Sequence, residues 1–338
     1  MYLRNEWYVA ALSRELQDKP LARTLLGESM VLFRTASGQA VVMDNRCPHR
    51  GAPLSSGEVV GESIVCGYHG FSFGASGRCN HIPGGANIPA KACVRSFPVI
   101  DRWGWVFVWM GDPAKADEAL LPDFRWTAEP GWAGGSDYLY VKSNYNLVRD
   151  NLLDLTHARY VHKKTLATSA VTDTPIRTTA EGRFVRVERN MLNIEPSPFF
   201  KKIPGFKSQV DHRQCIEFYP ATYISINTTV TAVAGSGDDR VAMFYVLNAM
   251  TPETDRSTHY FWALVRNFAP EDQEVSRMQH ELNKNTFLED VDILEQQQVL
   301  LETAPANWLP VAVPSDGGCV QAARLMKRLM AQETGEAP

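Results

Sequence analysis

Two cysteine–histidine pairs lie close together near the N-terminus. Cys47 and His49 form the first pair, and Cys66 and His69 form the second. Two thiolates and two imidazoles suit either a tetrahedral zinc ion or a two-iron cluster with two cysteines on one iron and two histidines on the other. A zinc finger usually takes its cysteines from one segment and its histidines from another. Here each segment supplies one of each, which favours the two-iron cluster.

A second group of polar residues falls in a helix predicted over residues 144–160. Asn151, Asp154 and His157 follow one another at intervals of three residues, so we expect them to share one face of that helix. An amide, a carboxylate and an imidazole on one face predict a polar functional site rather than an ordinary solvated helix face.

His157 and His162 are the imidazoles of this second group. They are five residues apart, about 140° around an ideal helix, so both reach one metal only if the helix breaks, which we expect near Tyr160–His162. Two histidines and one carboxylate form the iron site of non-haem Fe(II) oxygenases. The run Leu288–Glu295, in a helix predicted over 275–302, offers four acids. Such a run also suits a solvated helix face, so spacing leaves the acid open.

The composition is that of an ordinary globular chain. The sequence has 338 residues, a net charge of −4, 21% charged and 44% hydrophobic residues. These values argue against disorder and against nucleic-acid binding through phosphate neutralisation. No apolar run reaches membrane-spanning length and the N-terminus lacks a signal-peptide layout, so we expect a cytoplasmic protein with no membrane partner. Neither nucleotide-binding glycine motif is present, so these motifs give no support for binding of NAD(P) or ATP.

The elements around these residues predict an α+β chain. Short apolar or alternating segments, separated by glycine and proline, make the first third β structure. A polar, proline-containing stretch at 112–133 is the best domain boundary. Strands are expected over 165–265, and a short basic helix over 321–332.

The ligand patterns resemble those of the Rieske non-haem iron oxygenases. Cys47–Gly57 (CPHRGAPLSSG) and Cys66–Phe73 (CGYHGFSF) are similar to the family's cluster motif, and Asp150–His162 (DNLLDLTHARYVH) is similar to its iron motif. The resemblance implies an N-terminal all-β Rieske [2Fe–2S] domain over residues 1–118 and a catalytic domain of antiparallel sheet and helices over 119–338. It also implies one Rieske [2Fe–2S] cluster and one mononuclear Fe(II) per chain.

The resemblance assigns a role to each candidate residue. Asp290 is the expected third iron ligand, with Asp292 as the fallback, because the family's acid follows a glutamate on a late helix. Asn151 lines the iron site without binding the metal. The cluster ligands are then Cys47, His49, Cys66 and His69, and the iron-binding histidines are His157 and His162.

Asp154 is expected to link the two metal sites between subunits. In the family, head-to-tail trimers place one subunit's cluster beside the next subunit's iron. The resemblance therefore implies a homotrimer in which Asp154 accepts hydrogen bonds from His157 and from the neighbouring copy's His69. By itself, Asp154 also suits an ordinary acid on a helix surface.

Longer segments narrow the resemblance to one branch of the family. Arg4–Leu12, Ser96–Pro113 and Thr251–Phe268 are similar to vanillate and dicamba O-demethylases and to toluenesulfonate methyl-monooxygenases. This branch implies a terminal oxygenase that uses O₂ and a separate NAD(P)H-dependent reductase, of flavin or ferredoxin type. The expected reaction is O-demethylation of a methoxylated aromatic acid of the vanillate or methoxybenzoate type, with release of formaldehyde. Asn227 and Asn248, on predicted strands, are candidate substrate-binding residues.

Three alternatives remain at this level. The oxygenase could instead hydroxylate a methyl group or dihydroxylate the ring of another aromatic acid, such as an aryl sulfonate. The chain could be a Rieske electron-transfer protein with a defunct second domain, which the intact histidine and aspartate set argues against. It could also be a zinc-stabilised binding module, which a red-brown colour of the protein would exclude.

Overall fold

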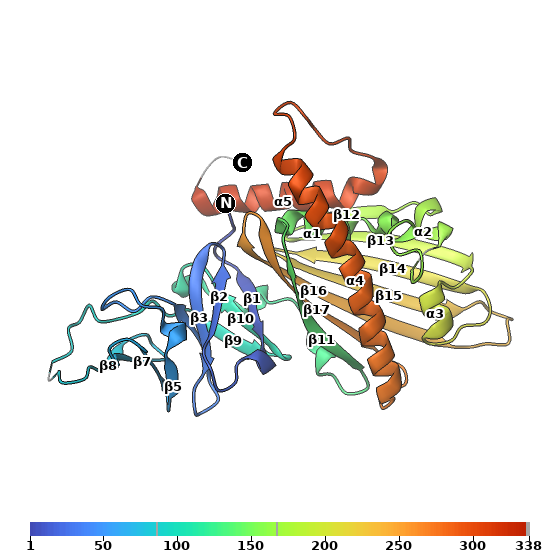
Figure 1. The fold of residues 1–338 in the computed structure, drawn as a ribbon. Helices are drawn as coiled ribbons and strands as arrows, with labels where there is room; N and C mark the ends of the chain where they lie inside the picture. Colours follow the sequence, from blue (N-terminus) through green and yellow to red (C-terminus); the bar gives the residue numbers. More distant parts are fainter. Residues whose placement is uncertain (86, 167, 336–338) are drawn as a thin grey trace. The chain divides into compact units, whose positions relative to one another are not determined.

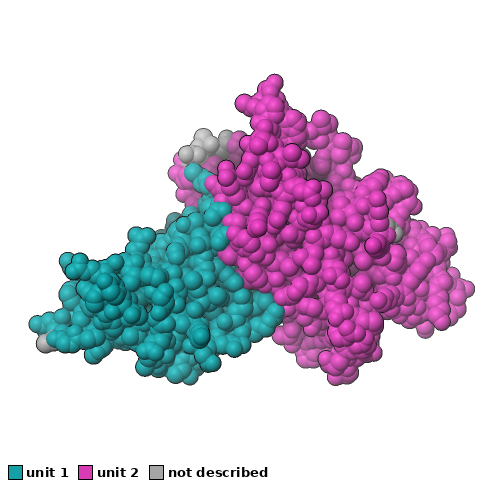
Figure 2. Space-filling model, viewed as in Figure 1, with its two compact units in different colours: residues 1–121, 251–254 teal, residues 122–250, 255–338 magenta. Residues whose placement is uncertain are grey.

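The computed structural model describes all residues except 86, 167 and 336–338. The chain forms two compact units (Figure 2): Met1–Leu121 with Thr251–Thr254, and Pro122–Met250 with Asp255–Pro338. The short segment Thr251–Thr254 belongs to unit 1 because its backbone and side chains bond there; for example, the Thr251 hydroxyl donates to the Val9 carbonyl at 2.7 Å. The boundary expected after residue 118 stays a prediction about domain organisation.

Unit 1 is built from three small antiparallel sheets. The first has the order β1 (Trp7–Leu12), β10 (Trp105–Trp109), β9 (Val99–Arg102), and the second β2 (Leu21–Leu25), β3 (Glu28–Arg34), β4 (Ala40–Asp44). The third runs β5 (Glu58–Val60), β6 (Ser63–Val65), β7 (Ser72–Gly74), β8 (Cys79–His81). Phe33, Ile64 and Phe73 pack in one buried cluster that also contains Cys47 and Cys66. The two cysteines are thus fixed in the core.

Unit 2 is organised around one seven-stranded antiparallel sheet (Figure 1). Its strands are rich in β-branched and aromatic residues, as β propensity favours. Their spatial order is β11 (Ala133–Val141), β17 (Ser257–Arg266), β16 (Val241–Thr254), β15 (Tyr223–Ala232), β14 (Val210–Tyr219), β13 (Phe184–Ile194), β12 (Arg177–Glu181).

Helices pack against this sheet and against one another. The long helix α4 (Gln273–Glu302) contacts β11 and β17, and α5 (Gly317–Thr334) contacts β12 and β13. The shorter α1 (Tyr145–Leu153) contacts both α4 and α5. The helices predicted over 275–302 and 321–332 are therefore confirmed as α4 and α5. No helix in the described part of the chain is both long and apolar enough to cross a membrane.

The helix expected to run to Tyr160 ends earlier. α1 stops at Leu153, Asp154 is extended (φ −114°, ψ 97°), and a 3₁₀ helix follows over Leu155–Arg159. The Asp154 carboxylate accepts a hydrogen bond from the Thr156 amide at 2.9 Å, which caps the new turn. The break expected near Tyr160–His162 is also present, because the 3₁₀ helix ends at Arg159 and helical structure therefore stops between His157 and His162. The earlier break at Asp154 was not expected, and because of it Asn151 and His157 do not share one helical face.

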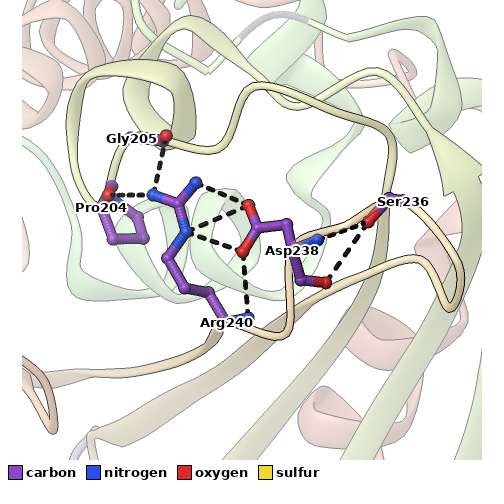
Figure 3. A network of polar contacts seen from close by, with 5 residues as sticks. All are labelled: Pro204, Gly205, Ser236, Asp238 and Arg240. Carbon is purple, nitrogen blue, oxygen red and sulfur yellow. Dashed lines mark hydrogen bonds and ion pairs between the residues drawn. The ribbon is translucent and has the colours of Figure 1, made fainter.

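A polar network holds the segment that follows α3 (Pro198–Lys202). Arg240, just before β16, donates to the Pro204 and Gly205 carbonyls at 3.1 and 2.9 Å (Figure 3). Its Nε also donates to Asp238 at 2.8 Å. The β15–β16 hairpin is thereby tied to the chain beyond α3.

Candidate metal centres

Two loops of unit 1 have the same hydrogen-bond pattern. The Cys47 amide donates to Ala52 at 2.9 Å and the Gly51 amide returns to Cys47, also at 2.9 Å. In the second loop, Cys66 donates to Phe71 at 2.8 Å and Gly70 donates to Cys66 at 3.0 Å. Both closing residues have positive φ, 73° and 69°, which glycine adopts without strain. Each loop therefore presents its cysteine and histidine in a similar frame.

The four donor residues converge with their thiols inside and their imidazoles outside. Cys47 and Cys66 are each 2% exposed, whereas His49 and His69 lie at the surface with ring centroids 4.6 Å apart. His49 also stacks on Phe71, with ring centroids 4.5 Å apart. Buried thiolates and exposed imidazoles fit a cluster with one iron in the core and its histidine-bound iron at the surface.

His157, His162 and Asp290 form a second group of donors in unit 2. One ligand atom from each lies within 4.8 Å of the others. The Asp290 Oδ1 is 3.3 Å from His157 Nε2 and 3.2 Å from His162 Nε2. His162 is 2% exposed and the Asp290 side chain 7%. The geometry thus brings together the donor set that suits a non-haem iron.

Neighbouring groups orient these donors. His157 Nδ1 lies 2.8 Å from the Asp154 carbonyl, and His162 Nδ1 lies 2.8 Å from Glu289 Oε2. Asn151 Nδ2 donates to Asp290 Oδ1 at 3.2 Å. Each imidazole therefore has Nδ1 bonded and Nε2 directed at Asp290, the arrangement that metal-binding histidines usually adopt. The orienting role of Glu289 was missed from the sequence, although its place beside Asp290 was a usable signal.

The electrostatics of this centre favour a cation. Burial alone would raise the pKa of Asp290, but hydrogen bonds from His157 and His162 lower that pKa to about 2. Burial also acts to lower the pKa of His162, yet the Asp290 and Glu289 carboxylates leave it raised. The carboxylates thus create a negative field at both imidazoles, which a divalent metal would satisfy.

Asp292 lies away from this centre. It is exposed on α4, and its carboxylate accepts a hydrogen bond from Gln296 at 3.1 Å. Asp290 faces the histidines because it shares a side of α4 with Asn283, Thr286 and Phe287, at helical spacing.

A cavity of about 130 Å³ opens beside the histidines and Asp290. Its wall is mostly apolar, and its lining includes side chains from the sheet, α3 and α4. An apolar cavity of about 150 Å³ accommodates benzene, so this one matches a single aromatic ring.

The two asparagines expected to bind substrate are placed elsewhere. Ile226 and Thr228 of β15 line the cavity, so Asn227 between them points to the opposite face of the sheet. Asn248 is fully buried, donates to the Ile224 carbonyl at 3.0 Å and accepts from the Tyr260 hydroxyl at 2.7 Å. Neither side chain belongs to the cavity lining in the described residues.

Comparison with known families agrees with this geometry. Residues 6–98 match the Rieske [2Fe-2S] domain, and residues 141–332 match the vanillate O-demethylase oxygenase C-terminal domain. The chain belongs to the Rieske non-haem iron oxygenases. This oxygenase therefore carries a Rieske [2Fe–2S] cluster and a mononuclear non-haem iron, as predicted from its sequence.

Individual relatives cover nearly the whole oxygenase. The iron-sulfur subunit of the toluene-4-sulfonate monooxygenase system of Comamonas testosteroni is 35% identical, with 99% of both chains covered. The vanillate O-demethylase oxygenase subunit of Pseudomonas sp. (strain HR199 / DSM 7063) is 35% identical, covering 98% of this chain and 96% of that one. The crystal structure of dicamba monooxygenase bound to 3,6-dichlorosalicylic acid matches with a TM-score of 0.94, at 32% identity and 99% coverage of both chains.

These matches confirm the family, the α+β fold class and the oxidoreductase class expected from the sequence. The roles of the individual residues remain predictions, for which the geometry gives the distances and hydrogen-bond partners.

One substitution tests the choice of carboxylate. We expect Asp290→Ala to lose the mononuclear iron and keep the cluster, because two imidazoles alone leave the metal without its anionic ligand. Iron per chain and the visible spectrum of the cluster measure both effects. Asp292→Ala, on the same helix, is the matched control and should keep all the iron. Retention of the mononuclear iron in Asp290→Ala would contradict the assignment.

Proposed function

We propose that this oxygenase removes the methyl group of a methoxylated aromatic acid. The observation that carries the proposal is the single-ring cavity beside His157, His162 and Asp290. The names of relatives also support O-demethylation, since relatives over nearly the full chain include the oxygenase subunit of vanillate O-demethylase and the oxygenase component of dicamba O-demethylase. The vanillate or methoxybenzoate type is the substrate class that these relatives' names suggest.

The proposed reaction balances with two electrons and two protons. One atom of O₂ is inserted into a C–H bond of the methoxy group, and the other leaves as water. The resulting hemiacetal collapses to a phenol and formaldehyde. Bound iron supplies the activation of O₂. The apolar wall excludes water and orients the methoxy carbon toward the histidines.

Residue roles follow from the geometry. Cys47 and Cys66 would bind one iron of the cluster, and His49 and His69 the other. His157, His162 and Asp290 would hold the mononuclear iron. Asn151 is a catalytic-site residue that holds Asp290 in place through its 3.2 Å hydrogen bond.

Asp154 and a homotrimer complete the electron path in this proposal. Asp154 lines a wide groove together with exposed Trp308 and Val311, which are 50% and 87% exposed. Exposed apolar side chains around a groove suit contact with another copy of the chain. The partner's histidine-bound cluster iron would then approach Asp154. His157 Nδ1 bonds the Asp154 backbone carbonyl rather than the expected carboxylate, so Asp154 would join the two metal centres through that carbonyl and through a carboxylate that accepts from the partner copy's His69.

Electrons would come from a separate NAD(P)H-dependent reductase of flavin or ferredoxin type. Relatives are named as the oxygenase component or as a subunit of a monooxygenase system, which supports a reductase that is a separate protein. Dependence on NAD(P)H supports a cytoplasmic location.

Hydroxylation of an aryl methyl group is the second candidate. It is favoured by the similarity to the toluene-4-sulfonate monooxygenase subunits, at 35% and 37% identity. The same cavity and iron suit oxygen insertion into an aryl methyl group as well as into a methoxy group. Ring dihydroxylation is a third possible reaction, and its diol product distinguishes it from the other two.

A single-turnover assay tests the reaction. Chemically reduced holoenzyme is mixed with methoxylated, methylated and unsubstituted benzoates and aryl sulfonates, and O₂ is admitted. We expect formaldehyde and the matching phenol, in equal amounts, from a methoxybenzoate. A benzylic alcohol or a diol without formaldehyde would contradict O-demethylation.

A second prediction concerns Asp154. Asp154→Asn keeps an oxygen to cap Thr156, so we expect both metal sites to stay loaded. The neutral amide weakens the bridge, so oxidation of the cluster during turnover should slow by about tenfold or more. Rapid-mixing absorbance of the cluster measures the rate. The exposed Asp173→Asn is the control, and an unchanged rate in Asp154→Asn would refute the bridge.

A further inference from the structure

The cavity has a second polar region besides the metal centre. His212 and Gln214 of β14 and Thr228 of β15 line it from the sheet, and Asn283 lines it from α4. Asn283 lies seven residues, or about 10 Å along the helix, before Asp290. A ring that reaches the histidines at one end can therefore meet these side chains at the other.

Two buried nitrogen atoms in this region have no hydrogen-bond partner among the residues that the structure describes. They are His212 Nε2 and Asn283 Nδ2. His212 is only 6% exposed, and its ring packs edge-on against Phe200 with centroids 5.1 Å apart. A buried donor without a partner destabilises the fold, because it has lost its hydrogen bonds to water. A ligand with acceptor groups would satisfy Asn283 Nδ2, and also His212 Nε2 in the tautomer that carries the imidazole proton there.

Arg189 places a buried positive charge directly behind this region. It lies on β13 opposite Gln214, and its side chain is 4% exposed. Nη1 donates to Gln214 Oε1 at 3.1 Å, and Nε donates to the Thr174 carbonyl at 3.2 Å. Arg189 has no ion pair within the described residues; Asp154 acts on its pKa only through the field. An arginine without a paired carboxylate is a rare buried group.

The hydrogen bond from Arg189 fixes the orientation of Gln214. Because Oε1 accepts from the guanidinium, the amide nitrogen of Gln214 keeps its two donor hydrogens for another partner. Burial, and then the charge of Arg189, lower the pKa of His212 to about 3. His212 is therefore a neutral imidazole at physiological pH, and the net charge of this region is that of Arg189.

We propose that Gln214, His212 and Asn283 bind the anionic group of the aromatic substrate, with Arg189 as its buried counter-charge. Because the Gln214 amide oxygen accepts from Arg189, the Gln214 amide nitrogen is free to donate hydrogen bonds to the anionic group. The carboxylate or sulfonate then lies at the end of the cavity remote from His157 and His162, and the methyl or methoxy group lies near them. The inference deepens the proposed function and rests on it for the direction of the ring.

Gln214→Glu tests the anionic end. The new carboxylate would pair with Arg189, so the fold is retained while the charge of Arg189 is neutralised. Binding to the holoenzyme is measured by calorimetry, without reductant, for para-methoxybenzoate and its neutral analogue para-methoxybenzamide. We expect the dissociation constant of the acid to rise about tenfold or more, and that of the amide to change less than about twofold. Gln209→Glu, the same substitution at an exposed position just before β14, should change neither.

Arg189→Met provides an independent variant, because it removes the charge and leaves Gln214 in place. Arg189→Met should likewise weaken binding of the acid and leave binding of the amide unchanged. Equal weakening of both ligands by Gln214→Glu, or unchanged binding of both, would overturn the proposal. The two proposals can fail separately. If the variants weaken binding of the acid but not of the amide, and the single-turnover assay gives no formaldehyde, the anionic end is upheld and O-demethylation is overturned.

Discussion

The active centre of this oxygenase depends on where the helical backbone ends around its two histidines. An unbroken helix would place His157 and His162 on different sides, about 140° apart. Because the 3₁₀ helix ends at Arg159, between the two histidines, both Nε2 atoms lie within 3.3 Å of one Asp290 oxygen. The earlier break at Asp154 frees the Asp154 carbonyl to bond His157 Nδ1. One residue thus ends the helix, caps the next turn and orients a ligand.

The long helix α4 provides the other half of the centre and one wall of the cavity. Its regular spacing brings Asn283, Phe287 and Asp290 to the same side. The sheet provides the opposite wall, where alternation along β14 and β15 decides which side chains enter. Asp290 and the polar residues at the other end of the cavity are therefore held by regular elements, whereas His157 lies in the 3₁₀ helix and His162 in the turn beyond it.

Much of this arrangement could be predicted from the sequence, because ligand motifs depend on short spacings. The cysteine–histidine pairs come from such local patterns, whereas the preference for Asp290 over Asp292 came from the resemblance to the family's motif. The five-residue spacing of the histidines also predicted the break after Arg159. The earlier break at Asp154 could not be found this way, since the Asp154 cap and the contacts of α1 with α4 and α5 decide it. Asn227 shows the limit for strands: a shift of one residue moves a side chain to the other face.

Pairing between distant strands was equally inaccessible to sequence analysis. Arg189 and Gln214 are 25 residues apart, and nothing local shows that they lie opposite each other on β13 and β14. That register places a charge behind the cavity without exposing it to the ring. The cavity thereby combines an apolar wall with a positive end, which suits a small aromatic anion better than a neutral hydrocarbon.

In the proposed complex, one cavity binds the methoxy group at its metal end and the acid at its arginine end. A crystal structure of the iron-loaded oxygenase with para-methoxybenzoate tests this most directly. We expect the methoxy carbon to lie nearest His157, His162 and Asp290, and the carboxylate to accept hydrogen bonds from Gln214. A reversed ring, with the carboxylate toward the histidines, or an acid bound outside the cavity, would contradict the account.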